Sequence, residues 1–210
     1  MSIIPIFIPH AGCPHQCVFC NQKKISGQKT ASAEAVRQQI DKYLQWIKPG
    51  KENEAAFYGG SFTGLDMDLQ EELFKPVDKL LQEEIIGSVR LSTRPDYIDE
   101  ERLVLLKKHN VSTVELGVQS LDDSVLELAG RGHNAASVVK AVELLCAHGF
   151  KTGLQLMCGM PGQTEASFME TIAESIALKP DMVRLYPLLV IKDTPLEETY
   201  RRGKFTPLGV

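Results

Sequence analysis

The chain has 210 residues, with 23 Lys and Arg, 27 Asp and Glu, a net charge of −4 and a pI near 5.8. Its length predicts one substantial domain, and an apolar fraction of 43% with a charged fraction of 24% excludes a disordered or fibrous chain. The slightly acidic balance excludes a large basic surface that could hold a nucleic-acid backbone unaided.

Charge is distributed unevenly, with seven Lys and Arg against four Asp and Glu in residues 1–60 and 16 against 23 in residues 61–210. Lys23, Lys24 and Lys29 form a local basic cluster that we interpret as a solvated loop, with an anion or RNA contact as the alternative. No apolar stretch approaches the roughly 18 residues of a membrane span, and the N-terminus lacks a signal-peptide pattern. We therefore expect a cytoplasmic protein whose five cysteines bind metal or do chemistry rather than form disulfides.

Hydrophobic patterning predicts strands that alternate with helices along the whole chain. In chain order these are strand 3–8, helix 32–47, strand 55–58, helix 67–84, strand 88–93, helix 99–109, strand 113–118, helices 122–129 and 135–148, strand 152–157, helix 164–178 and strand 182–188. The helix over 67–84 should continue through Pro76. No helix is expected in residues 192–210, whose ending suggests that a C-terminal part is missing.

The alternation predicts an α/β fold with parallel strands joined by right-handed crossovers. Patterning leaves two architectures open, a curved barrel-like sheet and a flat doubly wound sheet. Both place function in the loops after the carboxyl ends of the strands. The residues with chemistry follow strands in this way, so they should share one rim: the N-terminal cysteines, Gly59-Gly60-Ser61, Arg94-Pro95, Gln119-Ser120 and Cys158-Gly159.

Cys13, Cys17 and Cys20 are the most informative residues, because three thiols at spacings of four and three can reach one metal centre from one loop. A structural zinc site usually needs four ligands, so zinc stays an alternative only with His10 or His15 as the fourth. A cubane iron–sulfur cluster held by three cysteines would keep one iron open for a substrate or cofactor.

The CxxxCxxC spacing with Phe19 before the last cysteine resembles the signature of the radical S-adenosylmethionine (SAM) superfamily. Within that superfamily the chain resembles the group of the Elongator catalytic subunit and the oxygen-independent coproporphyrinogen oxidases. The matching segments run in family order over nearly the whole chain: 12–21, FYGGSFTGL at 57–65, LSTRPDYI at 91–98, VELGVQSLD at 114–122, 131–133 and LQLMCGMPGQT at 154–164.

The resemblance implies a partial (β/α)6 barrel, with a radical SAM core over residues 1–191 and the start of a C-terminal segment over 192–210. It also implies a [4Fe-4S] cluster on Cys13, Cys17 and Cys20 whose fourth iron chelates SAM. Reductive cleavage of SAM would then give a 5′-deoxyadenosyl radical that abstracts hydrogen from a substrate. The cofactor supplies this chemistry, whereas the protein supplies placement and exclusion of water.

The resemblance further implies which residues contact SAM: Phe19, Gly59, Gly60, Ser61, Ser92, Gln119, Arg131 and Gln155. Arg131 would pair with the SAM carboxylate, for which a guanidinium is physically suited, and the alternative is a surface arginine at a helix end. Phe19 would lie beside the adenine, with packing of the loop as the alternative. Gln155 matches a position that addresses the ribose, and Gly59-Gly60 lets the main chain approach the SAM ammonium.

Three other residues carry their own expectations. Glu115 is a carboxylate inside an apolar strand, so it should pair with a cation such as Arg94 or contact SAM. Cys146 should be a small core residue within its helix. Cys158 lies on the functional rim, where packing and redox roles are both open.

We therefore expect a radical SAM enzyme with a reductase such as flavodoxin or ferredoxin as electron donor. Residues 183–192 (VRLYPLLVIK) resemble the Elongator type and favour a tRNA nucleoside as substrate. The alternatives are a non-catalytic scaffold that binds the cluster and SAM, and an enzyme like the coproporphyrinogen oxidases. Asn21 argues against the last, because those oxidases typically have a second aromatic residue there.

Overall fold

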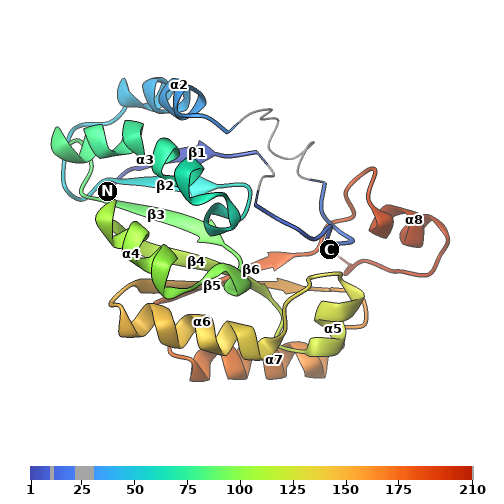
Figure 1. Cartoon of the computed structure of the whole chain (residues 1–210). Helices are drawn as coiled ribbons and strands as arrows, with labels where there is room; N and C mark the ends of the chain where they lie inside the picture. Colours follow the sequence, from blue (N-terminus) through green and yellow to red (C-terminus); the bar gives the residue numbers. More distant parts are fainter. Residues whose placement is uncertain (10–11, 22–30, 210) are drawn as a thin grey trace.

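The fold is a single six-stranded parallel sheet that curls into a half-barrel (Figure 1). The computed structural model describes residues 1–9, 12–21 and 31–209. Its strands are β1 (Ile3–Phe7), β2 (Glu54–Tyr58), β3 (Ser88–Thr93), β4 (Val111–Gln119), β5 (Lys151–Cys158) and β6 (Met182–Pro187). Each strand pairs with the one before it, so the sheet has none of the order reversal that a doubly wound sheet requires. Of the two architectures, the partial barrel is therefore confirmed.

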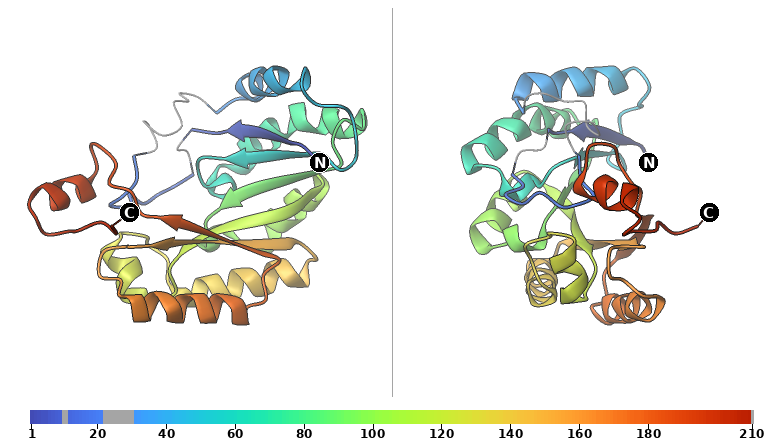
Figure 2. Two further views of the ribbon diagram at one scale, coloured as in Figure 1. Left: turned by 180° about the vertical axis from the view of Figure 1, so that it is seen from behind. Right: turned by 90° about the vertical axis from the view of Figure 1, so that its right-hand side faces the viewer.

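The long helices cover the outer face of this sheet (Figures 1 and 2). They are α2 (Ala33–Leu44), α3 (Met67–Gln82), α4 (Glu100–Lys108), α6 (Ala135–Ala147) and α7 (Glu165–Ala177), with the shorter α5 (Asp123–Leu128) and α8 (Pro195–Arg201) and 3-10 turns at Phe62–Gly64 and Pro95–Tyr97. The predicted helices are confirmed to within a few residues at their ends. As expected, α3 continues through Pro76.

The hydrophobic core lies between the outer face of the sheet and the helices, because alternate residues of each strand point toward the helices. Ile4 and Ile6 of β1, Phe57 of β2 and Leu116 of β4 are fully buried there. Phe57 also packs against Phe62 and Phe74, with ring centroids 4.7 and 5.6 Å away. This packing anchors the β2–α3 connection.

The opposite, inner face of the sheet is polar and holds a buried charge network. Glu115 of β4 accepts hydrogen bonds from Arg90 of β3 at 3.2 Å and from Arg184 of β6 at 3.0 Å. Arg90 also pairs with Glu54 of β2 at 2.7 Å. The expected pairing of Glu115 with Arg94 is wrong, because Arg94 lies beyond the end of β3 and pairs with Asp96.

Two further expectations are corrected by the structure. Residues 192–210 do contain a helix, α8, which begins because Thr194 caps it and Pro195 occupies its first turn. Cys146 is exposed rather than in the core, since its position on α6 points away from the sheet.

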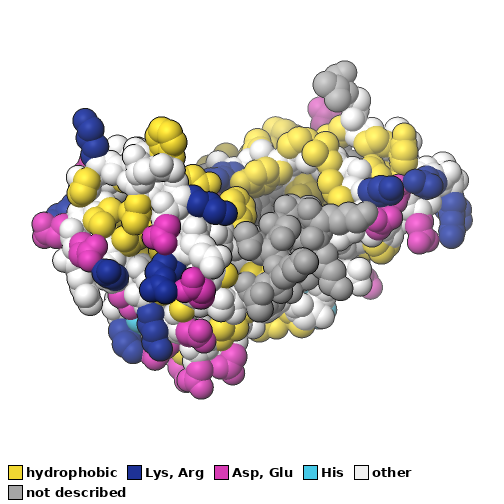
Figure 3. Space-filling model, turned by 90° about the horizontal axis from the view of Figure 1, so that it is seen from above, with side chains coloured by type: hydrophobic (Ala, Val, Ile, Leu, Met, Phe, Trp, Pro, Cys, Tyr) yellow, Lys and Arg dark blue, Asp and Glu magenta, His cyan; other side chains and the backbone are white. Residues whose placement is uncertain are grey.

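The described surface mixes acidic and basic side chains at both ends of the molecule (Figure 3). Lys23, Lys24 and Lys29 lie outside the described residues. Among the helices that the structure describes, none is both long and apolar enough to cross a membrane.

Candidate functional site

A cavity of about 230 Å³ opens where the carboxyl ends of the central strands meet the cysteine-bearing loop. It brings together residues from four strands and from four of the connections that follow strands or join helices. Its lining consists of Cys13, Tyr58, Gly59, Gly60, Ser92, Thr93, Arg94, Gly117, Gln119, Arg131 and Gln155. Seven of the residues predicted from the sequence therefore line one cavity.

Gln119, the last residue of β4, reaches this cavity through an unusual backbone conformation. Its φ is +72°, a left-handed value that is uncommon for residues other than glycine, and the register of β4 against β5 shifts between Gly117 and Gln119. Such bulges re-aim side chains and gather next to active sites. The Gln119 side chain is buried, and its Oε1 has no hydrogen-bond partner in the part of the chain that the structure describes, so the strained end of β4 holds an unpaired acceptor beside the cavity.

Gly59 is required at the end of β2 by its surroundings. Its φ is +109°, and a Cβ at this position would lie 2.5 Å from the main-chain oxygen of Ile8. No other residue fits without displacing β1. The main chain of β1 and the loop after β2 can therefore approach each other closely beside the cavity.

Arg131 comes from the turn between α5 and α6 and lies against the cysteine loop. It is only 7% exposed, so the alternative of a surface arginine is wrong. Its Nη1 donates to the Cys17 Sγ at 3.3 Å and its Nη2 donates to the main-chain oxygen of Gly117. Its Nε has no partner within residues 1–9, 12–21 and 31–209. Because no carboxylate pairs with it among the described residues, Arg131 offers a buried positive charge to the cavity.

Arg94 is a second buried guanidinium on the cavity wall. It forms two hydrogen bonds of 2.9 Å with the Asp96 carboxylate, and its Nη2 donates to the main-chain oxygen of Arg131 at 2.6 Å. This contact fixes the turn that carries Arg131. The Arg94 Nη1 is buried and has no partner among the residues that the structure describes, which leaves a further unpaired donor at this site.

Gln155 and Ser92 form the floor of the cavity on the inner face of the sheet. The Gln155 Nε2 donates to the Glu115 carboxylate at 3.0 Å and to the Ser92 Oγ at 3.3 Å. The charge network therefore holds the Gln155 amide in one orientation, with its nitrogen turned toward Glu115 and Ser92.

The thiols of Cys13 and Cys17 lie close to the two guanidinium groups. Burial raises the pKa of the Cys13 thiol above its ordinary value, although the nearby charges of Arg94 and Arg131 act to lower it. Cys17 is buried, and Cys20 is half-buried and donates its main-chain N–H to the Cys17 oxygen at 3.0 Å. A metal centre here would need all three as thiolates, so binding would displace a proton from Cys13.

The donor set fits a cluster with SAM better than it fits a single ion. Among the described residues, no group of three His, Cys, Asp or Glu is arranged to hold one metal ion, and His10 of the zinc alternative is not among those residues. Each thiolate of a cubane cluster binds a different iron atom, so the ligands surround the cluster instead of meeting at a point. The unpartnered donors of Arg94 and Arg131 suit a carboxylate, and the unpartnered acceptor of Gln119 suits an ammonium or hydroxyl group.

Two predicted SAM contacts do not line the cavity. Phe19 packs against the small apolar cluster of Val125, Ala129 and Met160, as the packing alternative expected. The Ser61 hydroxyl is buried and bonds to Thr93 Oγ1 at 3.0 Å, so it is used within the fold.

The rim residues Cys158 and His15 also lie outside the lining of this cavity. The Cys158 thiol is half-buried and donates to the main-chain oxygen of Tyr186 at 3.6 Å. His15 is exposed and lies against Gly132. His10 is not among the described residues.

Four lining residues were not predicted as contacts: Tyr58, Thr93, Arg94 and Gly117. Tyr58, Thr93 and Gly117 belong to the carboxyl-terminal ends of strands, and Arg94 directly follows β3. The rule that places function at these strand ends could have found them, whereas no motif marks Gly117 as the acceptor of the Arg131 hydrogen bond.

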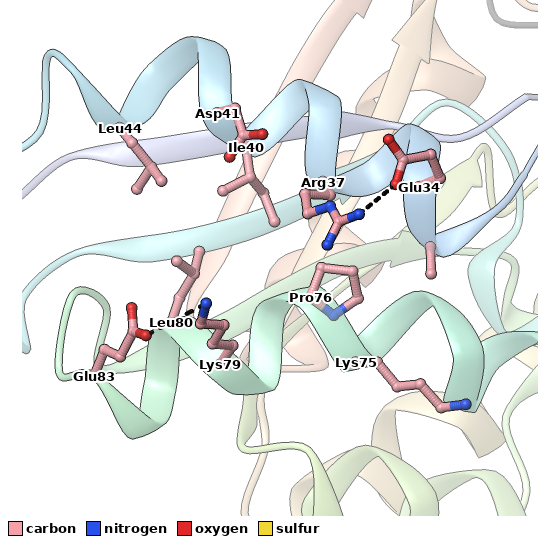
Figure 4. A pocket seen from close by; sticks show the side chains of 11 residues that line it. Glu34, Arg37, Ile40, Asp41, Leu44, Lys75, Pro76, Lys79, Leu80 and Glu83 are labelled. Carbon is pink, nitrogen blue, oxygen red and sulfur yellow. Dashed lines mark hydrogen bonds and ion pairs between the residues drawn. The ribbon is translucent and has the colours of Figure 1, made fainter.

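Two other cavities are weaker candidates for a reaction site than the cavity beside the cysteine loop. One of about 360 Å³ lies between α2 and α3 on the outer face and is lined by paired or exposed charges such as Arg37 and Glu34, which bond at 2.7 Å (Figure 4). Another of about 600 Å³ lies beside the α5–α6 turn and includes His133. Burial and the charges of Arg131 and Arg94 lower the pKa of His133 to about 3, so this imidazole is neutral at pH 7.

Comparison with known proteins gives matches over nearly the whole chain. The family model of the radical SAM superfamily matches residues 7–174, and that of the Radical_SAM C-terminal domain matches residues 180–210. The tRNA uridine(34) acetyltransferase of Methanocaldococcus jannaschii is 29% identical over 248 residues, which cover 99% of this chain and 46% of that protein. The oxygen-independent coproporphyrinogen-III oxidase-like protein HemZ of Bacillus subtilis is 25% identical, with coverage of 88% and 39%.

Among solved structures, Elp3 of the archaeon Methanocaldococcus infernus with an N-terminal deletion has a TM-score of 0.78 and 26% identity. The match covers 99% of this chain and 50% of that one. The chain thus spans about half the length, or less, of these relatives. The resemblance to both groups and the barrel fold are confirmed.

Proposed function

Because this chain belongs to the radical SAM superfamily, we propose that it is an enzyme that holds a [4Fe-4S] cluster through Cys13, Cys17 and Cys20 and cleaves SAM reductively. The observation that carries the proposal is the cavity of about 230 Å³, which Cys13 lines together with Arg94, Gln119 and Arg131. Arg131 also reaches the Cys17 sulfur, and these three side chains hold donors and an acceptor that have no partner among the described residues. Buried polar atoms are rarely left unpaired, so a ligand of matching polarity is expected there.

Each group of the cavity has a role in this proposal. Arg131 binds the SAM carboxylate through its unpartnered Nε, while its Nη1 keeps the hydrogen bond to the Cys17 sulfur. Gln119 accepts a hydrogen bond from the SAM ammonium or a ribose hydroxyl. Gln155 and Ser92 address the ribose from the floor. When bound, the cluster supplies the electron that splits SAM, which yields a 5′-deoxyadenosyl radical for hydrogen abstraction.

The open main chain beside the cavity completes the binding surface. Gly59 and Gly60 let the carbonyl groups of the loop approach a ligand without a side chain between them. The apolar packing of Phe19 against Val125 and Ala129 would hold the cysteine loop against α5.

For the substrate we propose a tRNA nucleoside. This choice rests on the relatives named as tRNA uridine(34) acetyltransferase and Elp3, and on residues 183–192, which resemble the Elongator type. The net charge of −4 gives the chain little overall attraction for an RNA backbone, and the face drawn in Figure 3 mixes acidic and basic side chains. Added sequence or a partner would then supply the basic surface. A reductase such as flavodoxin or ferredoxin would donate the electron.

The test is anaerobic loading with iron and sulfide, reduction, and quantification of 5′-deoxyadenosine from added SAM. We expect product from the wild type and none from Cys17→Ala, since two cysteines hold a cubane poorly. A loaded four-iron protein that binds SAM but forms no product would favour the scaffold alternative. Comparison with and without unmodified tRNA then tests the substrate, because tRNA should increase SAM consumption if it is the hydrogen donor.

A further inference from the structure

The loop that carries the three cysteines, residues 12–21 (the cysteine loop), is held from two sides. On one side, Val18 donates its main-chain N–H to the oxygen of Ala129 at 3.0 Å. On the other side, the Val18 oxygen accepts the main-chain N–H of Leu196 at 2.9 Å. The loop is thus hydrogen-bonded both to the end of α5 and to the start of α8, which lie at the same end of the molecule (Figures 1 and 2).

Asn21, directly after Cys20, adds a side-chain contact to the same second side. Its Nδ2 donates to the main-chain oxygens of Lys192 and Asp193 at 3.1 and 3.3 Å. This one amide therefore links Asn21 to main-chain groups that lie 171 and 172 residues later in the sequence.

The segment that accepts these hydrogen bonds, residues 191–197 (the α8 segment), is held by burial and by hydrogen bonds of its own. Leu196 and Thr194 are only 2% and 3% exposed. The Thr194 hydroxyl donates to the Ile191 oxygen at 2.7 Å and accepts the Glu197 N–H at 3.1 Å. The Asp193 N–H donates to the Glu197 carboxylate at 2.7 Å, with Asp193 at a left-handed φ of +61°. These contacts fix the two carbonyl groups that accept from Asn21.

We propose that Asn21 is a positioning residue for the cluster ligands, because its amide ties the cysteine loop to the α8 segment and so holds Cys20 in place. The inference rests on the proposed function, since it concerns the same cluster. It gives the α8 segment, which has no residue in the cavity, a role in holding the cofactor.

A thermodynamic consequence follows from this connection. If docking of the α8 segment favours the loop conformation that binds the cluster, then the bound cluster must favour docking by the same factor. Loading should therefore protect the α8 segment from cleavage, and loss of the Asn21 contact should weaken retention of iron.

The test compares wild type with Asn21→Asp, which keeps the shape of the side chain but cannot donate. Outer contacts of metal ligands are typically worth 10- to 100-fold in affinity, so chelator should remove iron about 10-fold faster from Asn21→Asp. Asn21→Gln, which keeps the amide, should recover part of the retention.

The matched control is Arg202→Ala, because Arg202 is exposed and pairs with Glu198 only within the α8 region. The electron paramagnetic resonance spectrum of the reduced cluster should also change in Asn21→Asp alone.

Trypsin cleavage after Lys192, which is exposed, gives the second measurement. In the cluster-free proteins Asn21→Asp should be cut faster than wild type, and loading should slow cleavage of the wild type. Equal iron loss and equal cleavage in Asn21→Asp and wild type would overturn the positioning role. A wild type that takes up no cluster would instead overturn the proposed function, and the cleavage rates would still show whether Asn21 holds the segment.

Discussion

Arg131 illustrates how one residue can serve both the protein and its ligand. Its guanidinium is anchored on the Cys17 sulfur and the Gly117 oxygen, and its Nε is left unused. Lysine could not make these contacts together, because an ammonium lacks the planar set of donors. The two anchoring contacts hold the guanidinium in place at the wall of the cavity.

We predict that Arg131→Ala weakens SAM binding by about 1.5–3 kcal/mol, the range for a hydrogen bond to a charged group. This corresponds to about a 10- to 150-fold rise in the dissociation constant. Isothermal titration of the anaerobically loaded variant with SAM checks this value. An unchanged dissociation constant would remove Arg131 from the binding site.

The buried imidazole of His133 should make the free energy of unfolding depend on pH. Burial, with Arg131 and Arg94 nearby, lowers its pKa from 6.5 to about 3 in the folded protein. Between these values the unfolded chain binds the proton and the folded chain does not, so stability falls as pH drops below about 6.5. His133 alone should cost about 2 kcal/mol between pH 7 and pH 5.

Urea unfolding of the cluster-free protein at both pH values measures this effect. The difference between wild type and His133→Gln at each pH cancels the contribution of the other titrating groups. We expect His133→Gln to lose less stability than wild type on going to pH 5. Equal losses in the two proteins would show that His133 is not held neutral by the fold.

At the scale of elements, the inner face of the sheet is organised around Glu115. Strands β3, β5 and β6 each contribute a donor to this carboxylate, namely Arg90, Gln155 and Arg184. The side chain of Glu115 is only 1% exposed. A buried charge of this kind is stable only while its partners are present, so one residue links the geometry of four strands.

We predict that Glu115→Gln destabilises the fold by about 3 kcal/mol, the low end of the range for breaking a buried ion pair. The low end applies because Arg90 would still form its ion pair with Glu54. In addition, the Arg184 side chain is 38% exposed, so water can solvate its charge. Urea unfolding gives the measurement. Glu71→Gln, which breaks an exposed pair with Lys108, is the control and should change stability little. A loss as small as that of the control would mean that the network adds nothing to stability.

At the scale of the whole molecule, the cysteine loop is where several distant parts of the chain meet. It touches the α5–α6 turn through Cys17 and Val18 and the α8 segment through Val18 and Asn21. A ligand that binds this loop only in the folded state must stabilise all of these parts together.

We therefore predict that anaerobic cluster loading raises Tm. Each kcal/mol of binding free energy should raise the Tm of a domain of this size by about 2–4 °C. Calorimetry or circular dichroism under anaerobic conditions checks the shift. Cys17→Ala treated in the same way should show no rise, and a similar rise in that variant would indicate nonspecific iron binding.

The sequence alone determined the order of strands and helices, because the apolar periods of 2 and 3.6 are local properties of the chain. It also determined the parallel pairing and the shared rim, since every strand is followed by a helix that must return the chain to the same edge. The positions of Cys13, Gly59, Gln119, Arg131 and Gln155 on one cavity followed from that rule and from the motifs.

Only the tertiary structure decided contacts between strands and between distant loops. Neighbours across the sheet depend on register, which patterning does not specify. The sequence therefore points to Arg94 as a partner of Glu115, whereas the structure pairs Glu115 with Arg90 and Arg184. The bond from Arg131 to Cys17 and the contact of Asn21 with the α8 segment join residues more than 100 positions apart. Such contacts exist only once the sheet has curled and brought both loops to the same rim.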